Sequence, residues 1–454
     1  MKKQHSNTRL LCQLSAVAAL VLSGNAMADE AFSADSKWMT GDWGGERTKL
    51  IEQGIDIKAD YVGEMGANLH GGYNDDKTGR YSDQFGLGVA FDLQKLLGWD
   101  NTQAKIQLTN RNGQNISNDR IGDPRAGTLS SSQEVYGRGH MVRLTQLWVQ
   151  HQFLDGKLDV KAGYFGEGED FNTFPCDFQN LAFCGSQVGN WATGIWYNWP
   201  VSQAALRIKY NITPELYAQI GAYNQNPSQL EHGNGFKLSG SGTKGTVLPV
   251  ELVWSPKLNS LPGEYRVGYY KSTADANDVR KDVNGQDAAN TGDAYRVHNS
   301  KHGYWFVGQQ QLTTHNGDAS RGLNIAANAT FHDKDTNVVD NYQSLMFVYK
   351  GPFDARPKDD VGIGFARIHV NDDVRKNAQL INEDNGISNY DNPLYMPLRD
   401  TEYNYEINYG FHVTNWLTVR PNLQYITHPG GVDGSRQRAG GRPENSVGVL
   451  RPLR

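Results

Sequence analysis

The chain has 454 residues, of which only 38% are hydrophobic, and its mean hydropathy is −0.62. Because soluble domains average roughly 45–50% apolar residues, this composition excludes an ordinary large soluble core. The 50 glycines and 22 tyrosines are typical of many strands and turns, and disordered chains lack such aromatic content. The net charge of −5 and a pI near 6.2 do not favour nucleic-acid binding.

The N-terminus has the pattern of a secretory signal peptide. Lys2, Lys3 and Arg9 precede a mostly apolar stretch from Leu10 to Leu22, and an A-x-A site ends at Ala28. A single anchoring helix is the alternative, but the apolar stretch is short and a cleavage site follows it. We expect cleavage after Ala28, which leaves 426 residues and lowers the net charge from −5 to −8. No later stretch approaches the roughly 20 apolar residues of a spanning helix.

The first part of the mature chain, residues 29–54, differs from the rest. Glu46–Gln53 is predicted to form one short helix that ends at Gly54. From residue 55 to the C-terminus at 454 we expect a single β-domain.

Side chains alternate along this second part with a period of two. Ile57, Ala59 and Tyr61 fall on one face of a strand, and Lys58 and Asp60 fall on the other. The same alternation occurs at residues 104–111, 206–210, 323–331, 402–409 and 417–425.

Two all-β architectures produce such two-faced strands. In a soluble sandwich the apolar faces meet in a core, whereas in a transmembrane antiparallel β-barrel they face lipid. The polar faces here carry long charged residues, and 426 residues suit about sixteen strands. The aromatic runs Trp196–Trp199, Tyr269–Tyr270 and Tyr304–Phe306 indicate interfacial girdles. We therefore predict a barrel; the alternative is a secreted soluble β-protein that binds or hydrolyses polysaccharide.

Two cysteines remain after removal of the signal peptide. Cys176 and Cys184 are close in sequence and lie in a compartment that permits disulfides, so we expect one bridge closing a short loop. A metal pair is disfavoured because no His–Cys cluster surrounds them. Free thiols are the remaining alternative.

Selection in a barrel with a wide, wet lumen requires a constriction. Hydroxyl-rich solutes exchange hydrogen bonds with charged or amide groups, and the apolar face of a sugar ring packs on aromatic rings. The candidates are Glu64, Arg111, Glu134 and Arg143, with Trp199 as an aromatic platform that folds inward from a strand end. The alternatives are solvated wall charges and, for Trp199, a girdle position.

Catalytic and cofactor motifs are absent from the sequence. It contains no H-E-x-x-H, G-x-S-x-G or P-loop pattern. Glu167 and Glu169 could serve glycoside hydrolysis, but a charged loop is the simpler interpretation. Residues 74–79 resemble a calcium loop without its acidic last position. We expect no enzyme activity, no metal and no cofactor.

A run near the start of the mature chain resembles a known family. The sequence Trp-Met-Thr-Gly-Asp-Trp-Gly-Gly-Glu-Arg at Trp38–Arg47 is similar to the N-terminal signature of the carbohydrate-selective porins of Gram-negative bacteria, the OprB type. Leu50, Gly54 and Asp56 continue the match, as does the Cys-containing region Gly163–Pro200. The resemblance extends to about residue 425.

The resemblance implies a sixteen-stranded outer-membrane channel that admits glucose and related sugars by diffusion. It places Arg111, Glu134 and Trp199 at a constriction made of arginine, acidic residues and an aromatic platform. It also implies contact with outer-membrane lipid and lipopolysaccharide, and a homotrimer. The C-terminus departs from the family because residues 440–454 have no aromatic residue and two prolines, so we expect an atypical or missing final strand and uncertain closure.

Overall fold

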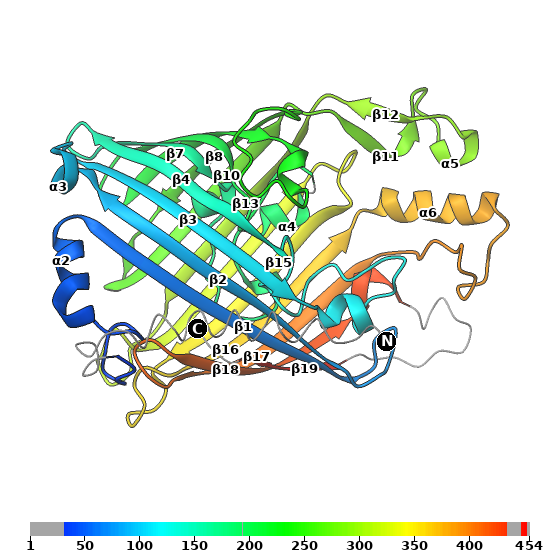
Figure 1. Cartoon of the computed structure of the whole chain (residues 1–454). Helices are drawn as coiled ribbons and strands as arrows, with labels where there is room; N and C mark the ends of the chain where they lie inside the picture. Colours follow the sequence, from blue (N-terminus) through cyan, green and yellow to red (C-terminus); the bar gives the residue numbers. More distant parts are fainter. Residues whose placement is uncertain (1–30, 193, 434–445, 452–454) are drawn as a thin grey trace, which may run out of the picture.

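The computed structural model describes residues 31–192, 194–433 and 446–451. The predicted signal peptide at 1–28 lies outside these residues. The described strands include one antiparallel sheet of seventeen, in which the two-residue β9 (Lys257–Leu258) only extends a hairpin of β10, so sixteen strands remain. Each of the sixteen pairs with two neighbours and the last pairs with the first, which makes a closed barrel (Figure 1). Their bounds are β1 Ile55–His70, β2 Gly79–Asp92, β3 Thr102–Gly113, β4 Met141–Phe153, β5 Leu158–Phe165, β6 Gln203–Asn211, β7 Leu216–Gln225, β8 Gly245–Trp254, β10 Leu261–Ser272, β13 Lys301–Gln311, β14 Gly322–His332, β15 Val339–Lys350, β16 Asp360–Val370, β17 Thr401–His412, β18 Thr418–Thr427 and β19 Ser446–Arg451.

The last strand closes the ring although it is short. β19 has six residues, pairs with β18 from Arg420↔Arg451 to Tyr425↔Ser446, and pairs with the sixteen-residue β1 from Met65 to His70. The part of the atypical C-terminus at residues 440–445 and 452–454 lies outside the described residues. The backbone edges of β1 and β18 are thus both paired at this point of the wall.

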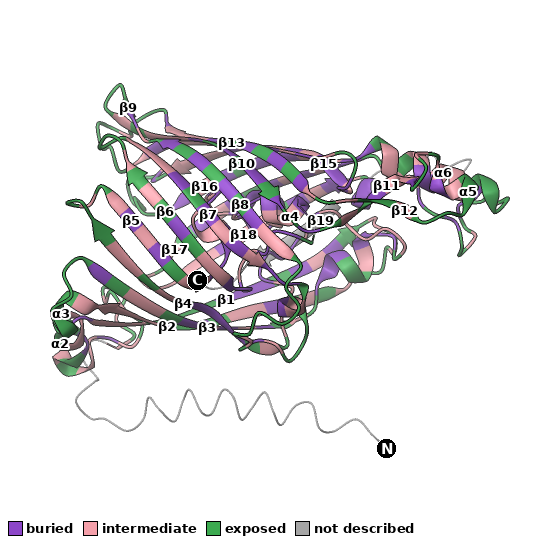
Figure 2. Ribbon diagram, turned by 90° about the horizontal axis from the view of Figure 1, so that it is seen from above, coloured by how far each residue is buried: buried purple, intermediate pink, exposed green. Residues whose placement is uncertain are grey.

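The faces of the strands decide between the two architectures considered above. The apolar side chains of the alternating pattern are exposed, among them Leu206, Ile407 and Leu423, whereas Arg207 and Glu406 on the opposite face are buried. Figure 2 shows this alternation as bands along each strand. A soluble sandwich would bury the apolar set. An outward apolar face and an inward polar face are the pattern of a barrel in lipid, so the barrel prediction is confirmed and the soluble alternative is wrong.

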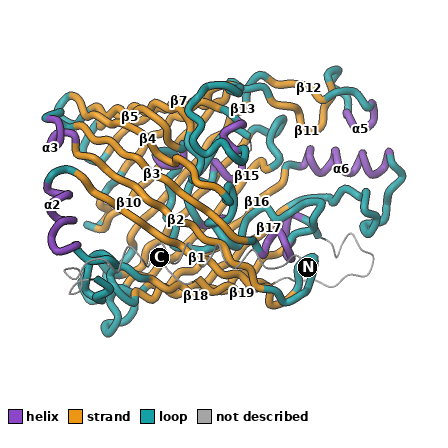
Figure 3. Tube along the Cα trace, in the orientation of Figure 1, coloured by secondary structure: helices purple, strands orange, loops and turns teal. Residues whose placement is uncertain are grey.

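The two ends of the barrel differ. Short turns and the helices α2 and α3 lie at one end, and the long connections, with the separate hairpin β11–β12, α5 and α6, lie at the other (Figures 1 and 3). Among the described residues, no helix is long and apolar enough to cross a membrane. The bounds of these elements are η1 Trp43–Gly45, α2 Glu46–Glu52, α3 Leu93–Leu97, η2 Ser117–Ile121, η3 Glu167–Glu169, η4 Leu181–Phe183, α4 Val188–Trp191, η5 Pro227–Leu230, β11 Ala276–Asp282, α5 Ala288–Thr291, β12 Tyr295–His298, α6 Asp372–Asp384 and η6 Pro429–Gly431.

The N-terminal signature packs against the start of β1. Arg47, in the predicted short helix, donates from Nη2 to the carbonyl of Ile57 at 2.9 Å. Its guanidinium also lies over the rings of Trp38 and Trp43, at 4.3 and 5.1 Å from their centroids. Gly45 has a φ of +93°, which favours glycine at the turn into the helix. The conspicuous Trp and Gly residues of the signature therefore fix the helix to the barrel wall.

Two long connections fold into the barrel. The β3–β4 connection covers residues 114–140, and the β5–β6 connection, residues 166–202, contains α4, which lies inside the ring (Figure 1). Glu406 of the far wall accepts hydrogen bonds from the backbone amides of Gln179 and Asn180 at 2.9 and 2.8 Å. Glu402 accepts similarly from Leu129 and Ser130 at 2.7 and 2.9 Å. Inward wall carboxylates thus hold both connections across the lumen.

Apolar contacts anchor the β5–β6 connection more extensively. Trp196 lies 5.7 Å from Trp305 and 6.0 Å from Tyr270 between ring centroids, and all three side chains are buried. The girdle interpretation is therefore wrong for the run at Trp196–Trp199. In the other two runs alternation sends Tyr270 and Trp305 inward, and only their neighbours face outward. These outward neighbours are Tyr269, Tyr304 and Phe306.

Candidate functional site

Four polar and aromatic side chains meet inside the barrel, and we call Gln84, Arg111, Glu134 and Trp199 the inner cluster. Arg111 Nε donates to Gln84 Oε1 at 2.8 Å, and its Nη2 lies 4.0 Å from Glu134 Oε2. The same oxygen of Gln84 accepts the indole N–H of Trp199 at 2.9 Å. Arg111 and Glu134 are buried and Trp199 is half-buried. One amide oxygen therefore aligns a cation and an aromatic ring beside a carboxylate.

The strand register positions the first two members of the inner cluster. Gln84 of β2 is paired with Arg111 of β3, so both side chains lie on the same face of the wall. Phe85 and Leu87 are exposed on the outer face, and this alternation directs Gln84 inward. The other two members are carried by the connections inside the lumen.

The backbone of Glu134 is fixed by neighbouring elements. Its amide donates to the carbonyl of Gln179 at 3.0 Å, which joins the β3–β4 and β5–β6 connections. Glu64 of β1 accepts from the amide of Val135 at 3.1 Å through its Oε2, and Glu64 is completely buried. The structure thus places Glu64 behind the connection that carries Glu134.

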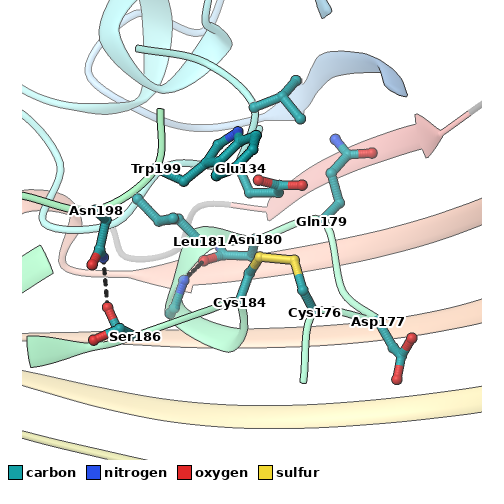
Figure 4. Close-up of a disulfide and its surroundings, with 12 residues drawn as sticks. Glu134, Cys176, Asp177, Gln179, Asn180, Leu181, Cys184, Ser186, Asn198 and Trp199 are labelled. Atoms are coloured by element: carbon teal, nitrogen blue, oxygen red, sulfur yellow. Dashed lines mark hydrogen bonds between the residues drawn. A yellow bond between two sulfur atoms is a disulfide. The ribbon is translucent and has the colours of Figure 1, made fainter. Parts of the chain in front are cut away.

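A disulfide lies directly beside the inner cluster. Cys176 and Cys184 are joined, as predicted, and close a short loop around η4. Figure 4 shows Trp199 and Glu134 next to each other above this bridge. The two sulfurs and a carboxylate oxygen of Glu134 lie within 4.8 Å of one another. Because bonded sulfurs are not thiolates, this group does not offer the ligands of a metal centre.

Arg143 occupies a separate position next to the inner cluster. Its Nε donates to the carbonyl of Arg138 at 2.9 Å, and its Nη1 and Nη2 donate to those of Gln229 and Leu230 at 2.8 and 3.3 Å. With Arg111, it lines a pocket of about 300 Å³. The structure therefore groups Arg111, Glu134 and Trp199, and places Glu64 and Arg143 at the edges.

The acidic pair Glu167 and Glu169 lies in the part of the β5–β6 connection that is folded inside the barrel. Glu167 is completely buried at the base of the β5–β6 connection, where it accepts from the amide of Tyr197 at 3.3 Å and from Gln203 Nε2 at 3.2 Å. Burial raises the pKa of Glu167 to about 8. Glu169 pairs with Lys161 at 3.3 Å. The two residues thus lie in a loop, as the sequence indicated, but this loop is folded against the inside of the wall.

Gln84 is the member of the inner cluster that the sequence analysis missed. Its signal is the alternation of β2, which separates Phe85 and Leu87 from Gln84, but an uncharged amide is less conspicuous in a sequence than a charged residue. The segment Tyr136–His140 was also missed, since loop residues carry no periodicity.

The comparisons with known proteins agree with this architecture. The model of the OprB family, described as carbohydrate-selective porin, matches residues 76–444. The chain belongs to this family. Porin B of Pseudomonas aeruginosa is 67% identical over 434 residues, covering 95% of this chain and 96% of the relative. The putative porin QuiX of Acinetobacter baylyi is 43% identical over 429 residues, covering 92% and 95%.

A solved structure supports the same conclusion. The high-pH structure of Pseudomonas putida OprB superposes with a TM-score of 0.91 at 66% identity, covering 93% of this chain and 99% of that chain. The protein is thus a carbohydrate-selective porin of the outer membrane, as the sequence indicated. Its long connections belong to the outer side and its short turns to the periplasmic side, as in other outer-membrane barrels.

Proposed function

We propose that glucose and related sugars diffuse through this porin past the inner cluster, which forms its constriction. Support comes from the arrangement of Arg111, Glu134 and Gln84, which offers donors and acceptors, beside the half-buried ring of Trp199. A sugar sheds water at a narrow point and needs replacement hydrogen bonds for its hydroxyls. The ring of Trp199 supplies contact for the C–H face of the sugar.

The same arrangement favours passage over retention. Transport needs a site that binds weakly enough to release its solute, and a few hydrogen bonds with one aromatic contact meet that requirement. Flux follows the concentration gradient, and the protein acts as a channel that catalyses nothing. Glu64 and Arg143 are proposed to position the neighbouring backbone, because both are buried and bonded to it.

The test is solute block in planar bilayers. Purified full-length porin is expected to show a conductance that glucose reduces with saturation, whereas a neutral solute of similar size without a pyranose ring reduces it only linearly. Equal, unsaturated effects of both solutes would contradict the proposed constriction. Liposome swelling with the same two solutes provides an independent readout of flux.

Oligomerisation and membrane contacts complete the proposal. Polar residues lie on the outward face of β2 and β3, where Asn112 donates to Asp83 at 3.3 Å and Asn110 adjoins them. Polar groups are costly against lipid, which supports a homotrimer contact there. The remaining outward aromatic residues are proposed to contact lipid and lipopolysaccharide. Chemical crosslinking in detergent tests the trimer, and N-terminal sequencing tests a mature start at Asp29.

A further inference from the structure

A basic pocket lies next to the inner cluster, between the end of the β3–β4 connection and the β7–β8 connection. Its volume of about 300 Å³ is at the lower end of the range for sites that hold small molecules. The residues that carry its chemistry are Arg111, Tyr136, Arg138, His140, Arg143 and His232.

The charge of this pocket is one-sided. Three of its lining residues in the described chain are arginines, and none is an aspartate or glutamate. Arg143 binds backbone carbonyls, which carry no formal charge and leave its positive charge uncompensated. Glu134 approaches Arg111 from outside the pocket, at 4.0 Å. Positive charge that converges on a pocket with no carboxylate among its described lining residues attracts an anion.

Arg138 is the arginine available to a solute. Its side chain is exposed, and its electrostatic neighbour is the uncharged phenol of Tyr197. Arg143 already donates to three backbone carbonyls, and Arg111 donates to Gln84. A guanidinium forms two parallel hydrogen bonds with a carboxylate or phosphate, so Arg138 is suited to this role.

The backbone around Arg138 is held in an unusual shape. Arg138 and His140 have φ values of +58° and +59°, a region that few non-glycine residues adopt. Contacts maintain it: the amide of His140 donates to the carbonyl of Arg111 at 2.6 Å, and the ring of His232 bonds the carbonyl of His140 at 2.9 Å. A strained segment fixed by its surroundings is typical of a functional position.

We propose that this pocket binds an anionic monosaccharide, that is, a sugar bearing a carboxylate or a phosphate, before it enters the constriction. Arg138 holds the anionic group in the field of Arg111 and Arg143, while Tyr136 and His140 offer partners for hydroxyls. The inference rests on the proposed function, because the pocket shares Arg111 with the inner cluster. Glu134 at the inner cluster repels the anionic group, so the solute is held in the pocket by its charge.

The experiment compares block by glucose, gluconate and glucose 6-phosphate in planar bilayers at constant ionic strength, using the full-length porin. Arg138→Gln is expected to raise the half-blocking concentration of at least one anionic sugar about tenfold and to leave that of glucose unchanged. Which anion responds identifies carboxylate or phosphate as the recognised group. Arg138→Lys keeps the charge but not the planar fork, and should show an intermediate effect. Arg296→Gln, on the separate hairpin at the same end, is the matched control for loss of one charge.

Three outcomes would overturn the inference. The first is an unchanged block by both anionic sugars in Arg138→Gln. The second is an equal shift for glucose, which would assign Arg138 to the constriction. The third is block by acetate as strong as that by gluconate, which would indicate general anion attraction. Missing glucose block in the wild type, with Arg138-dependent gluconate block intact, would contradict only the proposed glucose passage.

Discussion

Gln84 in β2 and Trp199 in the β5–β6 connection share a hydrogen bond of 2.9 Å that joins the barrel wall to the segment inside it. The accepting oxygen also holds Arg111 of the neighbouring strand at 2.8 Å. A single uncharged side chain therefore bonds both the cation and the aromatic ring of the inner cluster.

Gln84→Ala should weaken glucose binding without removing any charge. The substitution leaves Arg111 and Trp199 without their shared acceptor, and an unsatisfied donor costs about 1–3 kcal/mol. We expect the half-blocking concentration of glucose in planar bilayers to rise several-fold. Gln107→Ala is the matched control, because Gln107 also faces inward from β3 and its amide, among the described residues, donates to the Leu108 carbonyl at 3.4 Å and not to the inner cluster. Equal effects of both variants would contradict the role given to Gln84.

Substitutions at Gln84 and Trp199 should have non-additive effects on glucose block. Trp199→Phe keeps an aromatic face but lacks the indole N–H, so it removes the same hydrogen bond. A double-mutant cycle compares the loss of glucose-binding free energy, obtained from the half-blocking concentrations. For the variant carrying both Gln84→Ala and Trp199→Phe, this loss should be smaller than the sum of the losses in the two single variants. Strict additivity would show that the two side chains act separately.

Arg111→Ala should abolish saturation of glucose flux while increasing ion conductance. The substitution removes the cation that bonds Gln84 and approaches Glu134, and it also removes side-chain volume from the lumen. Liposome swelling should then rise linearly with glucose concentration. Arg111→Lys keeps the charge but not the planar fork, and should show an intermediate effect. Unchanged saturation in Arg111→Ala would mean that selection occurs elsewhere.

The docking of the β5–β6 connection should weaken at alkaline pH. Burial raises the pKa of Glu167 from 4.5 to about 8, so the docked segment keeps a proton that the undocked segment releases. Stability therefore falls as the pH rises from about 4.5 to about 8, and is constant beyond. Conductance noise and protease cleavage within residues 166–202 should increase between pH 6 and pH 9. Glu167→Gln should remove this dependence, whereas Glu215→Gln, on an exposed turn, should not.

Removing the disulfide should loosen the support of the inner cluster. Cys176 and Cys184 are eight positions apart, and closing a loop of that size contributes about 2–3 kcal/mol in the chain-entropy model. The double variant with serine at both positions should keep the barrel but show earlier proteolysis near η4 and larger conductance noise. Reduction of the wild-type porin should reproduce the effect, and reduction of the double variant should add nothing to it.

Much of the fold could be predicted from the sequence because a barrel wall obeys one rule. The two-residue period of side chains such as Arg207 and Ile208 reports directly which face meets lipid and which meets the lumen. The number of strands followed from chain length, and the disulfide from the spacing of two cysteines. The family signature at residues 38–47 indicated that the solutes are carbohydrates.

The parts that sequence reasoning missed lie where this rule fails. A bulge in β4 pairs Gln107 with Gln146 but Leu108 with Leu144, so Thr145 is extra and the alternation near Arg143 is interrupted. The inward position of Trp196 depends on contacts with Tyr270 and Trp305, which are distant in sequence. Periodicity carries no information about such contacts.

The contact between Trp196 and Trp305, which anchors the β5–β6 connection, affects how the pore responds to ionic strength. The indole of Trp305 lies over the backbone of Gly268, its partner on the neighbouring strand. A Cβ atom at residue 268 would overlap this ring, so the absence of a side chain there allows the close contact. Packing of this kind is not weakened when dissolved ions screen charges. A change in the salt content of the medium would therefore alter how readily charged solutes approach, while this anchor of the β5–β6 connection stays packed.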